Sequence, residues 1–246
     1  MASTRGFRQR VRDELTREIK DVARRQLAQV GAGGLSVRAV TRELGMASSA
    51  VYRYFPSRDA LLTALITDAY VGLGQAARRA ESQVAREDHL GRWKAVFRSV
   101  REWAREHPHE YALVYGSPVP GYAAPEHTAI PAGEVVILLA QIAIEAAVAR
   151  RTGTPGDDPV TDALATDVEI LKTHPAVSQD DEIAAALAEM PASGVLHVLD
   201  AWTMLFGAVS FELFGHYADV LTSLDDYLDR LATKSAAPLG LTHQHS

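Results

Sequence analysis

Apolar residues recur at three- and four-residue intervals along almost the whole of this 246-residue chain. That spacing places them on one face of an α-helix, whereas a half-buried strand needs alternation, and we find no alternating run. In residues 12–30, for example, Leu15, Ile19, Val22 and Leu27 share one face. Because 47% of the residues are hydrophobic, the chain can bury a substantial core. The sequence therefore predicts an all-α fold.

Glycine, proline and capping residues divide this pattern into helices. Gly31 to Gly34 end a first helix over 12–30, and Gly45 ends a second over 37–44, which Ser36 caps. A short third helix over 48–54 stops before Pro56, and Ser57 caps a long fourth helix that we expect to link two domains. Further helices are expected over 91–106, 108–115, 132–151, 161–172, 181–189, 194–217 and 221–233, with loops over 116–131 and 152–159.

Charge is distributed unevenly between the two ends of the chain. Residues 1–60 hold 12 Lys and Arg against 6 Asp and Glu, a formal charge of +6, whereas the rest of the chain carries −12. This asymmetry fits a small basic module for a polyanion attached to an acidic body. A solvated basic helix is the alternative explanation.

Several function classes lack the residues that they need. The chain has no cysteine, so disulfides, zinc thiolates and thiol nucleophiles are excluded, and a cytoplasmic location is expected. The apolar segment 135–149 is too short and too polar to span a bilayer, and no export signal precedes it. The histidine pairs His107/His109 and His243/His245 do not match a metal-site pattern, and Gly31 to Gly34 do not match a phosphate loop. The acidic pairs fall in loops or near helix starts, where carboxylates are favourable; they are Asp157/Asp158, Asp180/Asp181 and Asp225/Asp226. We therefore expect no enzyme activity, no cofactor, no metal and no membrane partner.

The segment from Ser36 to Leu65 has the order of a helix-turn-helix. Two short helices meet at a tight turn around Gly45, behind a longer helix. In such a motif the second short helix enters the major groove, where small side chains let its backbone approach the base edges and Tyr, Arg and Ser bind phosphates.

The residues that follow this turn make the resemblance specific. The family pattern is a small residue, an aliphatic residue, Tyr, any residue, an aromatic residue and Phe, and then Ser, a basic and an acidic residue. This chain matches it with Ala50, Val51, Tyr52, Arg53, Tyr54 and Phe55, and, after Pro56, with Ser57, Arg58 and Asp59. Over residues 12–70 the chain resembles the tetracycline-repressor (TetR) family of transcriptional regulators. The resemblance implies a three-helix DNA-binding domain over 1–60, a larger helical effector-binding and dimerisation domain over 61–236, and a disordered tail over 237–246.

The resemblance also implies a role for each matching residue. Ser48, Ser49 and Ala50 would face base edges. Phosphates would be contacted by Tyr52, Tyr54 and Arg58, with Arg53 as a further candidate. Ser36 and Arg38 would meet the DNA backbone from the second helix. Packing is the alternative for the two tyrosines, and solvation for Arg58. Ala47 replaces a common capping Ser and Ser49 a frequent Gly, so the operator sequence stays unassigned; Ser48 is an alternative cap.

Four arginines lie ahead of the first predicted helix or at its first residue. Arg5, Arg8, Arg10 and Arg12 form a basic arm that would follow the DNA backbone or enter the minor groove. A disordered solubilising tail is the alternative.

The acidic body resembles a C-terminal domain type with Trp, His and Gly in its penultimate helix. Trp202 and Gly207 fit this pattern, whereas Phe206 occupies the His position. The segment 194–217 is apolar on more than one face, which favours a homodimer in which two helices per subunit form a four-helix bundle. The central helix of a monomeric core is the alternative.

Six aromatic residues around a Pro/Gly-rich loop are the candidates for an effector site. They are Trp93, Phe97, Trp103, Tyr111, Tyr115 and Tyr122, and each has simple core packing as its alternative.

The expected function is a TetR-like regulator, a repressor that binds a palindromic double-stranded DNA operator as a homodimer and is released by a small apolar or aromatic effector. A helical dimeric ligand-binding or protein-interaction module without specific DNA binding is the alternative. The sequence identifies neither the effector nor the regulated genes.

Overall fold

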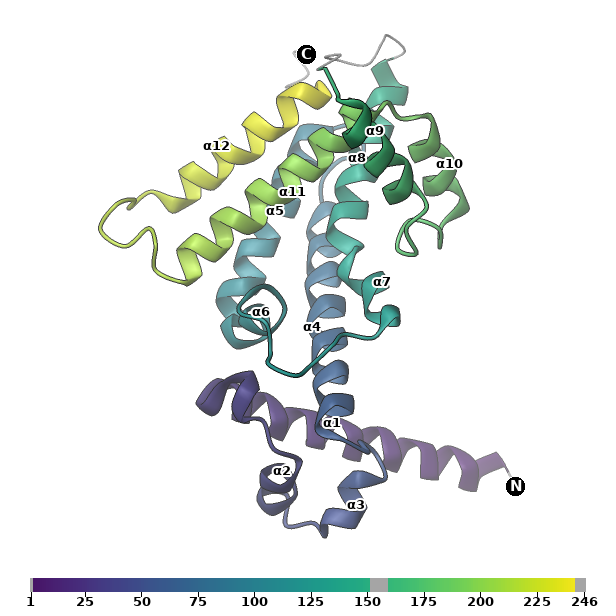
Figure 1. Cartoon of the computed structure of the whole chain (residues 1–246), viewed down its shortest axis with the longest axis vertical. Coiled ribbons are helices and arrows are strands. Elements are labelled where there is room, and N and C mark those ends of the chain that lie inside the picture. Colours follow the sequence, from purple (N-terminus) through teal and green to yellow (C-terminus); the bar gives the residue numbers. More distant parts are fainter. Residues whose placement is uncertain (1, 151–158, 242–246) are drawn as a thin grey trace. The chain divides into compact units, whose positions relative to one another are not determined.

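The computed structural model describes residues 2–150 and 159–241, and within them all regular structure is helical. Figure 1 labels the elements. The α-helices are α1 (Ala2–Gly34), α2 (Val37–Glu43), α3 (Ser48–Tyr52), α4 (Arg58–Glu81), α5 (His89–Glu106), α6 (Pro108–Tyr115), α7 (Ala129–Ala132), α8 (Glu134–Arg150), α9 (Asp162–Lys172), α10 (Asp181–Glu189), α11 (Ala192–Leu213) and α12 (Leu224–Ala236). Two 3-10 helices, η1 (Glu126–Thr128) and η2 (Ala237–Leu239), complete the set. The predicted all-α fold is confirmed.

The chain forms two compact units. Unit 1 contains residues 1–69 and 107–128, and unit 2 contains residues 70–106 and 129–246. Helix α4 therefore contributes its first half to unit 1 and its second half to unit 2. The two units group residues that pack against one another. They differ from the two domains predicted to divide at residue 60, because α6 packs against α1 and so belongs to unit 1. The functional division at residue 60 stays a prediction.

Unit 1 is built on α1. Its buried face carries Ile19, Val22, Ala23 and Leu27, as the three- and four-residue spacing predicts. Gly31 adopts φ 67° and ψ 176°, which breaks the helix at the predicted glycine segment and turns the chain toward α2. Two ion pairs tie α1 to α4, because Lys20 Nζ lies 2.8 Å and Arg24 Nη2 lies 2.6 Å from Asp68.

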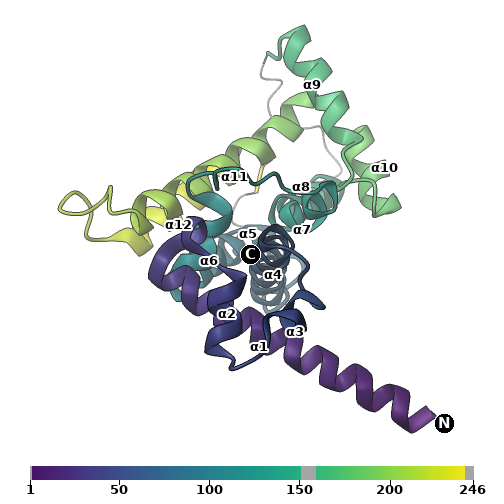
Figure 2. The same cartoon turned by 60° about the horizontal axis from the view of Figure 1, so that its bottom comes forward.

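The predicted basic arm is helical. The first described residues continue α1 as a helix that begins at Ala2, and its N-terminal turns project beyond α2 and α3 (Figure 2). Residues 6–14 are exposed on all sides. Residues 1–12 contain no proline and a single glycine, Gly6, so α1 extends past the apolar stripe that located it. The predicted start at residue 12 was therefore wrong, and the alternative of a disordered tail does not fit the helix described over these residues.

Unit 2 is a bundle in which α5 packs against α8, α11 and α12. A buried arginine joins three of its helices. Arg92 on α5 is 1% exposed, and it donates to Glu81 on α4 and to Glu145 on α8, each over 2.6 Å. Burial opposes the cation, but the hydrogen bonds to Glu145 and Glu81 outweigh it, so the pKa of Arg92 is raised. Paired in this way, the buried charge links the bundle instead of destabilising it.

The chain after α12 is ordered as far as Leu241. Residues 237–239 form η2, Gly240 turns the backbone with φ 65°, and Leu239 and Leu241 are buried. The predicted disorder of 237–246 is therefore wrong for 237–241, because two leucines bury their side chains there. Residues 242–246, with His243 and His245, lie outside the described residues.

Among the residues that the structure describes, two helices, α4 and α11, meet the length and hydropathy expected of a membrane span. The bent pair formed by residues 126–132 and 134–149 meets them as one broken span. Sequence reasoning considered only segment 135–149. In this structure α11 packs against α8, α9 and α12, and α4 carries Asp68 in ion pairs with α1. Each helix buries part of its apolar surface in the structure, α4 through residues such as Leu61 and Leu65 and α11 through residues such as Val198 and Leu205.

Candidate nucleic-acid interface

Helices α2 and α3 form the predicted helix-turn-helix. Ser36 precedes α2 with extended backbone, and its hydroxyl accepts a long hydrogen bond of 3.5 Å from the Ala39 N–H. Gly45 adopts φ 64° in the turn, a conformation that disfavours residues with a Cβ. Ala47 occupies the N-cap position of α3 and makes no side-chain cap. Ser48 is the first residue of α3, so it does not take over the capping position.

The surface of α3 divides into a packed and an open side. Val51 and Phe55 are buried, as is Val40 on α2, and these side chains pack the motif into the core of unit 1. Ser49, Tyr52 and Arg53 are exposed, and Ala50 and Tyr54 are half-buried. Tyr52 is 41% exposed, so packing does not account for its side chain. The side chain of Ser48 lies outside the described part of the chain.

The cations of unit 1 fall into two groups. Some are held by carboxylates: Lys20 and Arg24 bind Asp68, and Arg25 lies 2.9 Å from Glu43. Others have exposed side chains that make no hydrogen bond or ion pair with the described residues: Arg8, Arg10, Arg17, Arg38, Arg42 and Arg53. Only the second group is available to phosphates at no internal cost.

Arg58 belongs to neither group. Its Nε donates to the Leu35 carbonyl over 3.1 Å and its Nη2 to the Ala32 carbonyl over 2.7 Å, while Nη1 lies 3.6 Å from Asp59. The guanidinium thus fastens the start of α4 to the connection between α1 and α2. This geometry supports a structural role for Arg58 rather than the phosphate contact or the solvated cation that the sequence suggested.

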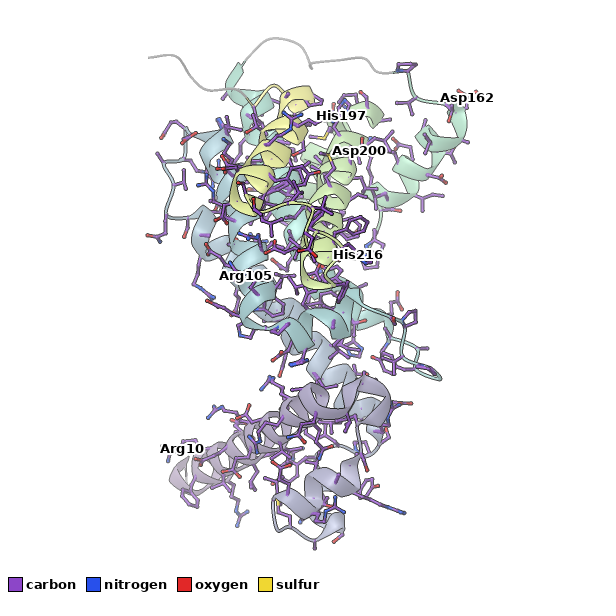
Figure 3. The ribbon with its side chains drawn as sticks, turned by 90° about the vertical axis from the view of Figure 1, so that its left-hand side faces the viewer. Arg10, Arg105, Asp162, His197, Asp200 and His216 are labelled. Carbon is purple, nitrogen blue, oxygen red and sulfur yellow. The ribbon has the colours of Figure 1, made fainter. Side chains whose placement is uncertain are left out.

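A basic groove runs beside α3. It has a volume of about 490 Å³, and it is lined by Phe7, Arg8, Gln9, Val11 and Arg12 of α1 and by Arg53 and Tyr54. The Arg12 guanidinium lies 5.7 Å from the centre of the Tyr54 ring, within cation–π range. Arg10, which lies between Arg8 and Arg12 in the sequence, is at the same end of α1 (Figure 3). The helical extension of α1 therefore brings Arg8 and Arg12 next to Arg53.

Arg42 was missed by the sequence reasoning. It lies four residues after Arg38 on α2, so the two share one face of that helix. The i, i+4 spacing of two arginines was the available signal, but it is common on solvated helices.

The six aromatic effector candidates do not belong to one unit. Trp93, Phe97 and Trp103 lie in unit 2, and Tyr111, Tyr115 and Tyr122 lie in unit 1. Trp93 and Phe97 are fully buried and stack at 6.2 Å, and the Trp93 indole donates to Ser235 over 3.1 Å. The Tyr122 hydroxyl lies 2.9 Å from the Thr63 hydroxyl. Core packing explains Trp93 and Phe97, and an effector contact by the six stays a prediction.

Comparisons with known proteins match both parts of the chain. Residues 19–65 match the bacterial regulatory proteins of the tetR family, and residues 93–234 match the tetracyclin repressor-like C-terminal domain. The HTH-type transcriptional regulators Mb1846 of Mycobacterium bovis and Rv1816 of Mycobacterium tuberculosis are each 39% identical to this chain over 219 residues, which is 88% of either length. This chain belongs to the TetR family of transcriptional regulators. The Trp-His-Gly resemblance of α11 stays a prediction.

A solved structure supports the same fold for this TetR-family regulator. The crystal structure of SCO4313 superposes with a TM-score of 0.72 at 29% identity, and the match covers 94% of this chain and 98% of that one. These relationships identify a transcriptional regulator and not an enzyme.

Proposed function

We propose that this regulator is a cytoplasmic repressor that binds a palindromic operator as a homodimer. The observation that carries the proposal is the set of exposed, unpaired cations around α3: Arg38, Arg42 and Arg53. A recognition helix needs phosphate contacts on both sides to hold it in the major groove. With α3 carrying Ser49 and Ala50 at its start, small side chains leave room for the backbone near base edges.

The proposed DNA surface extends to the first turns of α1. Arg8 and Arg12 line one groove together with Arg53 and Tyr54, so a phosphate held there would meet cations from two helices. We assign Tyr52, Arg53, Arg38 and Arg42 to phosphates, with Ser36 beside them, and the start of α3 to bases. Arg58 is left out of this surface because its donors bind backbone carbonyls.

The homodimer is proposed to form through α11. One face of this helix is buried in unit 2 through Val198, Leu205 and Val209. The other face exposes a continuous stripe at helical spacing: Asp200, Thr203, Gly207, Phe211 and Phe214. Phe211 is 50% and Phe214 46% exposed, and a Cβ at Gly207 would meet no atom within 4 Å. Two large aromatics beside a glycine suit close packing of a second helix, which fits the two-fold dimer that the family resemblance implies.

Release from DNA is proposed to follow the binding of a small apolar or aromatic effector. The support is membership of the family, in which such a molecule favours a dimer whose recognition helices no longer match the operator spacing. The effector changes the equilibrium between the DNA-binding and the released dimer conformation only as far as it binds one of them more tightly than the other.

Binding of the purified full chain to fragments from upstream of its own gene tests the proposal. Fluorescence anisotropy at several salt concentrations should give nanomolar affinity for one fragment and far weaker binding to unrelated DNA. In Arg53→Gln the slope of log K against log [salt] should become less steep by about 1, because one phosphate contact is lost.

Arg79→Gln is the matched control, since Arg79 is also exposed but lies on α4 in unit 2. For Arg79→Gln, the slope of log K against log [salt] should equal that of the original chain. Equal affinity for every fragment, or an unchanged slope in Arg53→Gln, would favour a helical ligand-binding or protein-interaction module without specific DNA binding.

A further inference from the structure

Unit 2 contains an apolar cavity of about 400 Å³ that the regulator's DNA surface does not use. Four elements form its walls: α8, α10, the start of α11 and η2. Figure 1 shows the end of α12, which leads into η2, beside the first turns of α11. The volume lies in the lower part of the range in which proteins bind small molecules. None of the six aromatic effector candidates lines this cavity.

The walls are almost entirely hydrocarbon. Ala143 and Ala147 of α8, Ala186 and Met190 at α10, and Leu239 of η2 face the cavity. Water in such a space finds few hydrogen-bond partners, so an apolar molecule gains free energy by displacing it. Methionine side chains are unbranched, so Met190 can adapt the cavity to its content. Its Cγ would lie 3.0 Å from a Cβ on Gly194, so a larger residue at position 194 would enter this space.

Two polar side chains line the cavity, His197 and Glu189. Figure 3 shows His197 on α11 one turn from Asp200. The imidazole offers a hydrogen-bond donor and an acceptor, whereas the exposed Glu189 carboxylate brings a negative charge to the rim. An anionic head group would be repelled by Glu189, while a hydroxyl or carbonyl pairs with His197.

We propose that this cavity is a binding site for a small neutral molecule, mainly apolar, whose alcohol or carbonyl group hydrogen-bonds to His197. The site is formed within unit 2 alone, and ligand binding there does not depend on the proposed operator binding. It is separate from the residues that sequence reasoning selected for the effector.

The test uses N-phenyl-1-naphthylamine, a neutral apolar dye whose fluorescence rises in apolar sites, titrated into the full chain. Ala186→Phe fills the cavity and should weaken dye binding at least ten-fold. Ala185→Phe is the matched control, because this exposed neighbour on α10 does not line the cavity, and it should bind as the original chain does. Gly194→Leu is a second blocking variant, and circular dichroism checks that all three fold.

Competition with 1-octanol and octanoate tests the chemical class. Octanol should displace the dye at a concentration several-fold lower than octanoate. His197→Phe should weaken octanol about two- to ten-fold, the value of one hydrogen bond, while dye affinity changes less than two-fold.

Three results would overturn the proposal. The first is unchanged dye affinity in the folded Ala186→Phe and Gly194→Leu variants, and the second is an equal loss in Ala185→Phe. The third is a change in molecular mass by light scattering in Ala186→Phe, which would make the cavity an interface between copies of the chain. Equal displacement by octanol and octanoate would overturn the assignment of a neutral head group.

Discussion

At the scale of single residues, backbone conformation and donor geometry decide roles that residue type leaves open. Gly45 and Gly33 both have open space where a Cβ would stand, but only Gly45 has a positive φ. Arg58 and Arg53 are both arginines beside α3, but only Arg58 binds carbonyls of its own unit. Each pair provides an experiment in which the second member is the control.

Gly45→Ala should destabilise the chain by about 1–2 kcal/mol, because alanine is strained in the left-handed region. Gly33→Ala should be neutral or stabilise by about 0.4–1 kcal/mol, since no positive φ is required there and the unfolded chain loses freedom. Urea unfolding of both variants measures the difference. Equal free energies of unfolding would show that the turn tolerates a Cβ.

Arg58→Gln should lower the free energy of unfolding by about 1.5–3 kcal/mol, the value of hydrogen bonds from a charged group. The salt slope of DNA binding should stay at that of the original chain, in contrast to Arg53→Gln. Thermal unfolding and anisotropy are measured on the same samples. A reduced slope with unchanged stability would restore the phosphate contact that the family resemblance implied.

At the scale of elements, ion pairs from α5 join this helix to most of its neighbours in unit 2. Arg92 joins α5 to α4 and α8, Arg101 binds Glu212 on α11, and Lys94 and Arg98 bind Asp229 on α12. Burial alone would raise the pKa of Asp229, but hydrogen bonds from Lys94 and Arg98 outweigh burial and lower this pKa. The pair between α5 and α12 is therefore sensitive to acid.

Because the pKa of Asp229 is lower in the folded chain, its stabilisation is present above the unfolded value of about 3.9 and is lost as the pH falls through the folded value. Asp229→Asn should thus be less stable than the original chain at pH 7, and the difference should shrink toward pH 3. Urea unfolding at both pH values measures it. A deficit for Asp229→Asn that stays the same at both pH values would contradict the linkage.

At the scale of the whole molecule, the proposed assembly depends on the one face of α11 that unit 2 leaves uncovered. The helix is apolar around most of its circumference, and one bundle can bury only one side of it. We propose that a second subunit covers this face, because a regulator that reads two half-sites binds DNA as a dimer.

Phe211→Asp should convert the dimer to a species near the 26.7 kDa chain mass at micromolar concentration, because a carboxylate in an apolar interface is costly to desolvate. Ile170→Asp is the control, since Ile170 is 65% exposed on α9 outside the stripe, and its mass should not change. Light scattering coupled to size exclusion measures both. A monomeric original chain would contradict the proposed assembly.

The sequence by itself determined the helical class, the helix-turn-helix and its family, because periodicity, capping residues and the order from Ala50 to Asp59 are local properties. It also located the break at Gly31 and the bounds of α6 and α10. Only the tertiary structure decided that Arg58 binds the carbonyls of Ala32 and Leu35, more than twenty residues earlier, and that Leu239 and Leu241 are buried. Such contacts join segments distant in sequence, so neither residue type nor spacing encodes them; they depend on how the helices pack.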